Sequence, residues 1–399
     1  MPSEHPHTEN NVPFIDAILP GLGGLLAGGV FLLPAMAVDA VGPAALISLL
    51  LAAALALGLA RLAVSPDRSG APFSSFVPWW MGAVARIAAA SALAGVLSAY
   101  LLPRGTDATH SVVAGAALLL AGAAVMLGVA SSPSAVSIAT GAAVVGIGFY
   151  VGLAAPLATR SGFVPFAPHG WAAVLPGAGL LFFLFGGLEY PLCLSGVIVR
   201  PRQSIPRAAL LGAALMAVIA LIVTAVSVGV GGSAFTTHRL FARSVDHAPL
   251  LSIAAATGQP IALWGLSVGA SVCCAVAIHR LLSEAAESIA SLARLGQLPR
   301  ALGVASGSGD APWAAALAAS AIAIGASRVA SLEGLIEFAS GAVLVSYLAR
   351  LASRGWAWLA GAIVLMLALM PPSAWRSVGA AAILGVACYA ARGLWKTAS

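Results

Sequence analysis

Long apolar runs alternate with short segments rich in proline, glycine and charged residues along nearly the whole chain. A membrane-spanning helix needs about 20 consecutive apolar residues, and proline, glycine and charged residues mark where such a run ends. Parsing on that length predicts about twelve spans and leaves no stretch for a soluble domain. The expected spans cover residues 14–37, 42–64, 80–102, 111–130, 135–157, 174–198, 207–231, 261–289, 312–329, 333–353, 356–371 and 375–395.

The composition agrees with this pattern. Charged residues are 8% of the chain, against about 25% in soluble domains, and apolar residues are 60%, with a mean hydropathy of +1.01. A water-soluble globule could not keep so much apolar surface in solution, so we expect an all-α polytopic membrane protein surrounded by lipids. The formal net charge of +6 comes from short loops rather than from a basic domain, which argues against nucleic acid as a partner.

The placement of basic residues predicts the orientation of the chain in the membrane. Loops that would lie inside hold eleven arginines or lysines against six in the outer loops, which favours both termini in the cytoplasm. Residues 1–13 lack the basic region and cleavage site of a signal peptide, so we expect a retained cytoplasmic tail. The cysteines lie in apolar segments without CxxC spacing, and we expect neither a metal nor another cofactor. These features predict a multi-pass protein of the cytoplasmic, or inner, membrane.

Two apolar segments in different halves of the chain are interrupted by glycine at their middle: GLGGLLAGGVF at 21–31 and FFLFGGLEYP at 182–191. Interrupted segments at corresponding places in two halves of a membrane protein mark the substrate site of secondary transporters. The positions predict two five-helix repeats of inverted topology, residues 14–157 and 174–353, followed by two accessory helices at 356–395. The first and sixth spans would then be discontinuous helices that face each other near the membrane midplane.

Unwound backbone at midplane depth survives only where it lines a cavity or meets a ligand, because unpaired polar groups are costly in lipid. Free amides after the first break would bind a carboxylate, and carbonyls at both breaks would accept hydrogen bonds from an ammonium group. The expected amides are those of Ala27, Gly28 and Gly29, and the expected carbonyls those of Leu25, Phe183 and Gly186. A zwitterionic α-amino acid fits both sets. The alternative for each glycine run is close helix packing, which is common in membranes.

Several stretches resemble a known family. GLGGLLAGGVFLLPA resembles the span-1 signature of the amino acid, polyamine and organocation (APC) transporter superfamily, and FFLFGGLE resembles its span-6 signature. RPRQSIPRA and ARLGQLP are similar to the family's loops after spans 6 and 8, so the resemblance covers nearly the whole chain in order. The short length and the LEGLIEFASGAVLVSYLARL stretch look most like the small methionine and branched-chain amino acid exporters. The resemblance implies the LeuT-like form of the five-plus-five fold.

The resemblance also implies roles for particular residues. It gives the amides of Gly28 and Gly29 to the carboxylate, and it makes Phe183 an aromatic lid over the site. The carbonyls that it gives to the ammonium group are those of Leu25, Phe183 and Gly186. Gly28 stands where many relatives have serine, and span 5 lacks the lysine through which many relatives are coupled. Val197 occupies the place of an acidic residue usual before the RPRQSIPRA loop.

Some ionisable and polar residues in the spans have two interpretations each. Glu189 follows the second break inside an apolar span, where an ionisable group is a functional candidate by default. It either carries an exchangeable proton during transport or ties its helix to a neighbour. Ser267 and Ser271 in span 8 are either sodium ligands or serines bonded to their own helix backbone. Further along this span, Arg280 and Glu284 have the i,i+4 spacing of a helix-surface ion pair.

These observations predict a secondary transporter for a neutral L-amino acid of methionine or branched-chain type, with export favoured over uptake. Apart from Glu189 we expect no charge near the site, and the small residues Ala27, Gly186 and Gly187 would leave room for an aliphatic or thioether side chain. Two alternatives stay open: a proton- or sodium-coupled uptake permease for small neutral or aromatic amino acids, and a membrane sensor or partner that does not transport. An enzyme is not expected, since no GxSxG or HExxH motif occurs.

Overall fold

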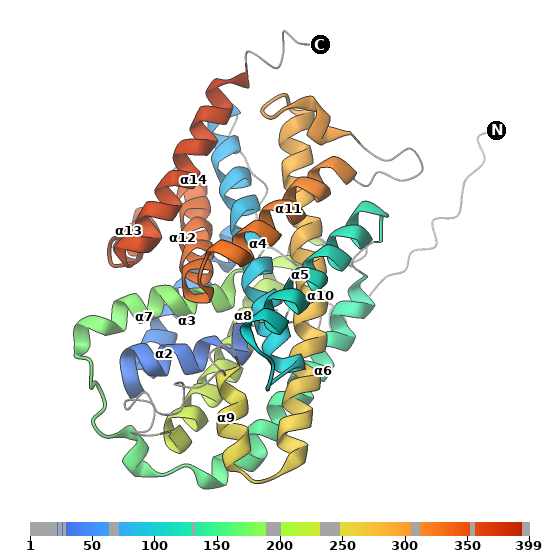
Figure 1. The fold of residues 1–399 in the computed structure, drawn as a ribbon. Helices are drawn as coiled ribbons and strands as arrows, with labels where there is room; N and C mark the ends of the chain where they lie inside the picture. Colours follow the sequence, from blue (N-terminus) through green and yellow to red (C-terminus); the bar gives the residue numbers. More distant parts are fainter. Residues whose placement is uncertain are drawn as a thin grey trace, which may run out of the picture.

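The structure is a computed structural model that describes residues 22, 26, 29–63, 72–129, 132–188, 201–231, 248–304, 312–351 and 356–392. Within these residues every regular element is a helix (Figure 1), as the apolar runs predict. The α-helices are α2 (Leu33–Val41), α3 (Ala45–Ala63), α4 (Pro72–Leu101), α5 (Asp107–Met126), α6 (Pro133–Ala154), α7 (Val174–Leu181), α8 (Pro201–Gly231), α9 (Pro249–Ala256), α10 (Pro260–Arg294), α11 (Trp313–Val329), α12 (Leu332–Leu351), α13 (Ala357–Ala368) and α14 (Pro372–Ala390). The short 3-10 helices are η1 (Gly29–Phe31), η2 (Gly42–Ala44), η3 (Ala155–Leu157), η4 (Arg160–Phe163), η5 (Trp171–Ala173), η6 (Phe182–Phe185) and η9 (Arg300–Gly303).

In this part of the chain, seven helical stretches are long and apolar enough to cross a membrane. The number is eight if α13 and α14, bent by 117° at their junction, form one broken span. These helices confirm a polytopic membrane protein, while the count of twelve spans stays a prediction. The first stretch, Leu33–Ala60, runs through the predicted boundary between spans 1 and 2. There Gly42 ends α2 with a φ of 76°, a backbone conformation that favours glycine.

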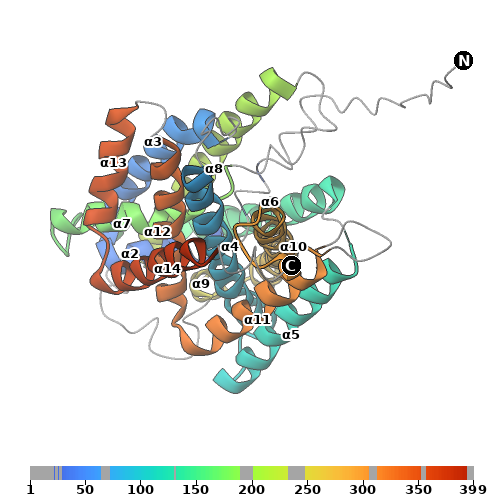
Figure 2. The same cartoon turned by 90° about the horizontal axis from the view of Figure 1, so that it is seen from above.

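The long helices α4 and α10 form the centre of the bundle, and the most extensive packing within the described residues joins them (Figures 1 and 2). On its other sides α10 packs against α6, whereas α4 packs against α12. The helices α5 and α11 pack against each other and against both central helices. Next to this central group, α3 packs against α7 and α8, and η6 contacts both α3 and α12.

Glycine lets α6 and α10 approach until their backbones touch. A Cβ atom added to Gly146 would lie 2.5 Å from the carbonyl oxygen of Gly265, and one added to Gly269 would lie 2.7 Å from the carbonyl oxygen of Ala142. Gly265 and Gly269 have the small-xxx-small spacing that allows such close helix pairs in membranes. This packing fixes the position of α10, which carries several residues of the cavity described below.

The last two helices lie together at one side of the bundle, next to α12 (Figure 2). The indole nitrogen Nε1 of Trp80 donates a hydrogen bond of 2.9 Å to the carbonyl oxygen of Ala381, which joins α14 to α4. The short helix α9, which the apolar pattern did not predict, lies between α8 and α10 along the chain and buries apolar side chains. No residue of α9, α13 or α14 lines the cavity between the central helices.

Candidate functional site

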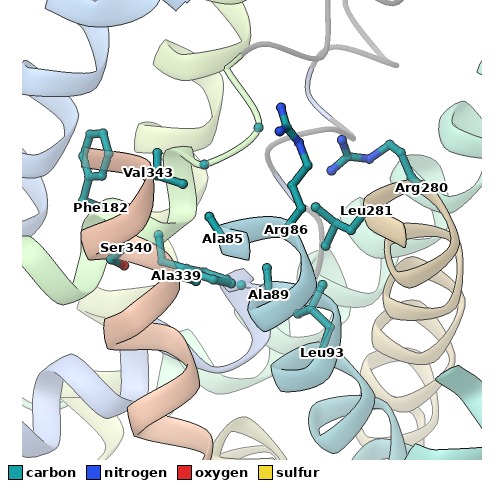
Figure 3. Close-up of a pocket in the computed structure, with 14 residues that line it drawn as sticks. Ala85, Arg86, Ala89, Leu93, Phe182, Arg280, Leu281, Ala339, Ser340 and Val343 are labelled. Carbon is teal, nitrogen blue, oxygen red and sulfur yellow. The ribbon is translucent and has the colours of Figure 1, made fainter. Parts of the chain in front are cut away.

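A cavity of about 520 Å³ lies where the broken segments meet the central helices (Figure 3). Its walls come from η1, α4, η6 with the turn after it, α10 and α12. The lining residues are Gly29, Ala85, Arg86, Ala89, Leu93, Phe182, Phe183, Gly186, Gly187, Arg280, Leu281, Ala339, Ser340 and Val343. Most of these side chains are small and apolar, so backbone groups and a few polar side chains carry the chemistry of this cavity.

The helix of the sixth predicted span loses its α-helical hydrogen bonding at the cavity. The helix α7 ends at Leu181 and continues as the 3-10 helix η6, after which the amide of Gly186 donates to the carbonyl oxygen of Phe183 over 3.0 Å. In the first predicted span, η1 precedes α2 with a similar short turn, in which the amide of Leu32 donates to the carbonyl oxygen of Gly29 over 3.1 Å. Irregular backbone therefore borders the cavity from two sides.

The two irregular segments touch each other. A Cβ atom added to Gly29 would lie 3.3 Å from Cδ2 of Leu184 and 3.5 Å from Cδ1 of Phe183. Any side chain at position 29 would therefore press on η6 and on the cavity wall. Because glycine leaves this space open, the backbone of η1 can approach both η6 and the cavity.

The structure brings three of the sequence-predicted site residues together. Gly29, Phe183 and Gly186 all line the cavity, as does Gly187. The predicted residues Leu25, Ala27, Gly28 and Glu189 lie outside the described residues. The roles given to all of these residues stay predictions.

The two predicted sodium ligands lie elsewhere on α10. Neither Ser267 nor Ser271 lines the cavity, to which α10 contributes Arg280 and Leu281. The hydroxyl of Ser271 is buried and has no hydrogen-bond partner among the described residues. The sodium role of these serines stays a prediction.

Two buried hydroxyl groups donate hydrogen bonds to backbone carbonyls of the two predicted broken spans. Tyr100, at the end of α4, donates a hydrogen bond of 2.7 Å to the carbonyl oxygen of Phe31 in η1. Ser48 in α3 donates over 2.7 Å to the carbonyl oxygen of Val174, at the start of α7. Sequence reasoning missed both residues, because a hydroxyl in an apolar helix gives no signal of the distant carbonyl that it binds.

A charged cluster forms one end of the cavity. The carboxylate of Glu284 accepts a hydrogen bond of 2.6 Å from Nη1 of Arg280 and one of 3.0 Å from Nε of Arg86. The pair of Arg280 and Glu284 confirms the ion pair predicted from their i,i+4 spacing. Arg86 joins it from α4, and in Figure 3 the side chains of Arg86 and Arg280 lie at the same end of the cavity.

This cluster corrects one expectation. From the sequence we expect no charge near the site apart from Glu189, yet Arg86 and Arg280 both line the cavity. The reason is the length of the two central helices. Since α4 begins at Pro72 and α10 continues to Arg294, the two arginines lie well inside their helices. An arginine inside an apolar helix is itself a signal of a functional site, and that signal could have found both residues.

A second cavity, of about 890 Å³, lies on another side of α4 and was not predicted. Its walls come from α4, α5, α11, α12 and the turn before α12. The lining residues are Ser91, Gly95, Ser98, Ala99, Asp107, His110, Ser111, Ala114, Ser327, Ala330, Leu332 and Leu335. Polar side chains are much more frequent here than in the first cavity, but no broken helix borders this one in the described part of the chain.

Comparison with known proteins finds similarity to transporters. The chain is 29% identical over 350 residues to "Uncharacterized transporter Rv1999c" of Mycobacterium tuberculosis (strain H37Rv), which covers 84% of this chain and 77% of the relative. It is 24% identical over 407 residues to "Uncharacterized amino acid permease YecA" of Bacillus subtilis (strain 168), which covers 93% of this chain and 92% of the relative. No protein-family model matches the chain.

These similarities extend over most of each chain, so they concern the whole bundle rather than one motif. The names of the relatives agree with the expectation that this chain is not an enzyme. Together with the apolar helices, they support a multi-pass membrane protein of a transporter or permease family.

Proposed function

We propose that this protein is a secondary active transporter of the APC superfamily that moves a neutral L-amino acid across the cytoplasmic membrane by alternating access. The observation that carries the proposal is the meeting of two irregular helix segments at one cavity, where Gly29 lies against Phe183 and Leu184. Paired broken helices at a shared cavity are the arrangement in which secondary transporters bind substrate. The similarity to an amino acid permease supports the substrate class.

The packing of the helices supports the five-plus-five inverted repeat. If residues 14–157 and 174–353 are repeats, α4 corresponds to α10, α5 to α11 and α6 to α12. Exchanging the partners turns the contact of α4 with α12 into that of α10 with α6, and both contacts are extensive. The same exchange turns the contact of α4 with α11 into that of α10 with α5, which is of similar extent. Helices α13 and α14 would then be the two accessory helices at 356–395.

In this proposal the backbone binds the charged ends of the amino acid. The amides of Gly28 and Gly29 would hold the carboxylate, and the carbonyls of Leu25, Phe183 and Gly186 would hold the ammonium group. The ring of Phe183 would close the site as an aromatic lid.

The walls of the cavity support a neutral side chain. Next to the irregular segments they consist of small or apolar residues such as Ala85, Ala89 and Val343. Arg86 and Arg280 lie at one end, where both donate to Glu284. Methionine and the branched-chain amino acids are therefore substrates to test first, with export as the favoured direction.

The proposal is tested by counterflow with purified protein in liposomes. Labelled amino acids are offered to liposomes preloaded with the same unlabelled amino acid, with and without a pH or sodium gradient. We expect accumulation of at least one neutral amino acid, which unlabelled aspartate and glutamate do not inhibit. Accumulation of no amino acid would contradict the proposal, and strong inhibition by aspartate or glutamate would move the substrate class to anionic amino acids, which Arg86 and Arg280 would then bind.

The same assay tests the coupling role proposed for Glu189. If this carboxyl carries the exchanged proton, Glu189→Gln removes the response of transport to a pH gradient, because an amide does not titrate. Counterflow without a gradient would then continue. An unchanged pH response in Glu189→Gln would leave only the interpretation as a strut between helices.

A further inference from the structure

Ser340 in α12 is a polar residue of the first cavity for which the described residues provide no partner. Its side chain is 1% exposed, and its hydroxyl has no hydrogen-bond partner among the described residues. It nevertheless lines the cavity, and Figure 3 places it beside Phe182 and Ala339, across the cavity from Arg280. The sequence alone predicts no role for Ser340.

Many other buried hydroxyls in these helices donate to their own helix backbone, whereas that of Ser271, which does not line the cavity, has no partner among the described residues. A serine or threonine in an apolar helix commonly donates to a carbonyl three or four residues earlier. Hydroxyls that do so here are those of Ser91, Thr140, Thr224, Ser227, Ser288, Ser320 and Ser346. Ser340 departs from this pattern at the place where it borders a cavity, and a buried hydroxyl left without a partner costs free energy.

The surroundings of Ser340 make its hydroxyl distinctive. The wall on either side is apolar, with Ala339 and Val343 on α12 and Ala85 and Ala89 on α4. Among the described lining residues, Ser340 has the one uncharged polar side chain. A ligand that reaches this wall therefore meets a single uncharged hydrogen-bonding side chain, to which no other described residue is bonded.

The position of Ser340 is fixed by the packing of its neighbour. A Cβ atom added to Gly341 would lie 2.9 Å from Cγ2 of Val378 and 3.4 Å from the sulfur of Met370. The backbone of α12 thus rests directly on α14 and on Met370, which lies between α13 and α14. A hydroxyl held this firmly can select between ligands, because it cannot withdraw from one that lacks a partner for it.

We propose that Ser340 determines specificity for the side chain of the transported amino acid and favours a short side chain that bears a hydroxyl or thiol, such as that of threonine, serine or cysteine. This inference rests on the proposed function, and within the neutral amino acids it shifts the preferred substrate from methionine and the branched-chain amino acids to those with a hydroxyl or thiol. With the charged groups of the substrate held at the irregular segments, the side chain extends toward α4 and α12. A hydroxyl there either donates to or accepts from Ser340, while an apolar side chain of equal size leaves Ser340 unpaired.

Threonine and valine give the sharpest test, because they differ by a hydroxyl in place of a methyl group. Counterflow of labelled L-threonine and L-valine is measured with the full-length protein in liposomes, for the wild type, Ser340→Ala, Ser340→Thr and Ser346→Ala. Ser346 is a matched control, since it lies buried on the same helix but donates to the carbonyl oxygen of Val343 and does not line the cavity.

We expect the wild type to prefer threonine to valine by at least roughly tenfold in the ratio of kcat to KM. In Ser340→Ala this ratio falls toward one while valine transport continues, which also shows that the variant is folded. Ser340→Thr, which keeps a hydroxyl, and Ser346→Ala both retain the preference.

Two results would overturn the inference. One is a wild type that transports valine as well as threonine, and the other is a Ser340→Ala variant in which both amino acids lose the same factor and the ratio is unchanged. In either case transport itself persists, so the proposed function stands. Absence of counterflow for every amino acid would remove the proposed function and this inference together.

Discussion

The two cavities on different sides of α4 differ in what lines them. The first, of about 520 Å³, is bordered by irregular backbone and by Ala89 and Leu93 of α4. The second, of about 890 Å³, is larger and lined by serines, Asp107 and His110, but its walls are regular helices and a turn. By volume and by side-chain polarity the second cavity looks more like a binding site. The irregular helices favour the first.

The two cavities also differ in the hydrogen bonds that their lining groups form. In the second cavity Ser91 donates to the carbonyl oxygen of Ile87 on its own helix, or to that of Ala323 on α11, and Ser98 donates to that of Gly95. The hydroxyls of Ser91 and Ser98 thus already donate their protons to backbone carbonyls. The helices that border this cavity are regular α-helices. Where α7 changes into η6, the backbone exchanges α-helical hydrogen bonds for those of a 3-10 helix and a turn. Irregular backbone at membrane depth is tolerated where it lines a cavity or is buried in protein. Nδ1 of His110 in the second cavity is buried and lacks a partner among the described residues, so unpaired side chains do not separate the two cavities. The irregular backbone is what favours the first cavity as the substrate site.

The largest effect is expected from removing the carboxylate at the end of the first cavity. Glu284→Gln leaves Arg86 and Arg280 without the anion to which both donate, and the side chain of Glu284 is only 19% exposed. Removing one partner of a buried ion pair costs about 3–5 kcal/mol in the free energy of unfolding. Denaturant titration of the detergent-solubilised protein measures this change.

Glu287→Gln is the matched control on the same helix. Glu287 pairs with Arg294, but the two side chains are 54% and 45% exposed, and such surface pairs contribute only about 0–1 kcal/mol. If Glu284→Gln proved no more destabilising than Glu287→Gln, the charged cluster would not be an integral part of the first cavity.

The next effect concerns the contact between the two irregular segments. Gly29→Val adds a branched side chain where a Cβ atom alone would come within 3.3 Å of Leu184 and 3.5 Å of Phe183. The side chain would push the segments apart and fill the cavity, and displacements of about 1 Å at such sites can cost on the order of 100-fold in rate. Counterflow in liposomes measures the loss.

Gly325→Val controls for the general effect of valine at a glycine. Gly325 is an exposed residue of α11, and a Cβ atom added there would meet nothing within 4 Å. Transport by this variant should match the wild type. Equal transport by Gly29→Val and the wild type would mean that the first cavity is not on the substrate path.

A smaller effect is expected from releasing η1 from α4. Tyr100→Phe removes the hydroxyl that donates to the carbonyl oxygen of Phe31 and leaves that buried acceptor without its donor, at a cost of about 1–3 kcal/mol. Because η1 borders the cavity, the change should raise the KM for transport by roughly tenfold. Concentration-dependent counterflow gives this value.

Tyr150→Phe separates a local effect from a general one. The hydroxyl of Tyr150 is also buried and bonded, but to Ser227 on α8, away from both cavities. Its loss should lower stability and leave the KM unchanged. A rise in KM of the same size in both variants would show that KM follows overall stability rather than the position of η1.

The sequence predicted the backbone of the site better than its side chains. Glycine runs inside apolar segments reveal where a helix can be interrupted, so Gly29, Phe183 and Gly186 were found from local sequence and lie at one cavity. The pattern also gave the all-helical membrane fold. It missed α9, a short apolar helix between two expected spans, because its length is below that of a span.

What the sequence could not show are the contacts made across the bundle. The i,i+4 spacing revealed the pair of Arg280 and Glu284, but Arg86 lies 198 residues from its partner and joins it only through the packing of α4 on α10. Likewise, nothing local distinguishes Ser340 from Ser346 on the same helix. Their difference arises from which face of α12 borders the cavity and from which hydroxyl finds a carbonyl.

The smallest effect is expected in the second cavity, and it is the direct test of the comparison. Ser91→Ala removes a hydroxyl that donates to backbone carbonyls of α4 and α11, and Ser98→Ala removes one bonded to its own helix. Since each hydroxyl already donates its proton to a backbone carbonyl, each loss should cost about 0.5–1.5 kcal/mol of stability and leave the transport rate within roughly twofold of the wild type. A tenfold loss of transport without a matching loss of folded protein, in either variant, would place the second cavity on the substrate path. Volume and side-chain polarity would then have been the better guide, and the irregular backbone of the first cavity would need another explanation.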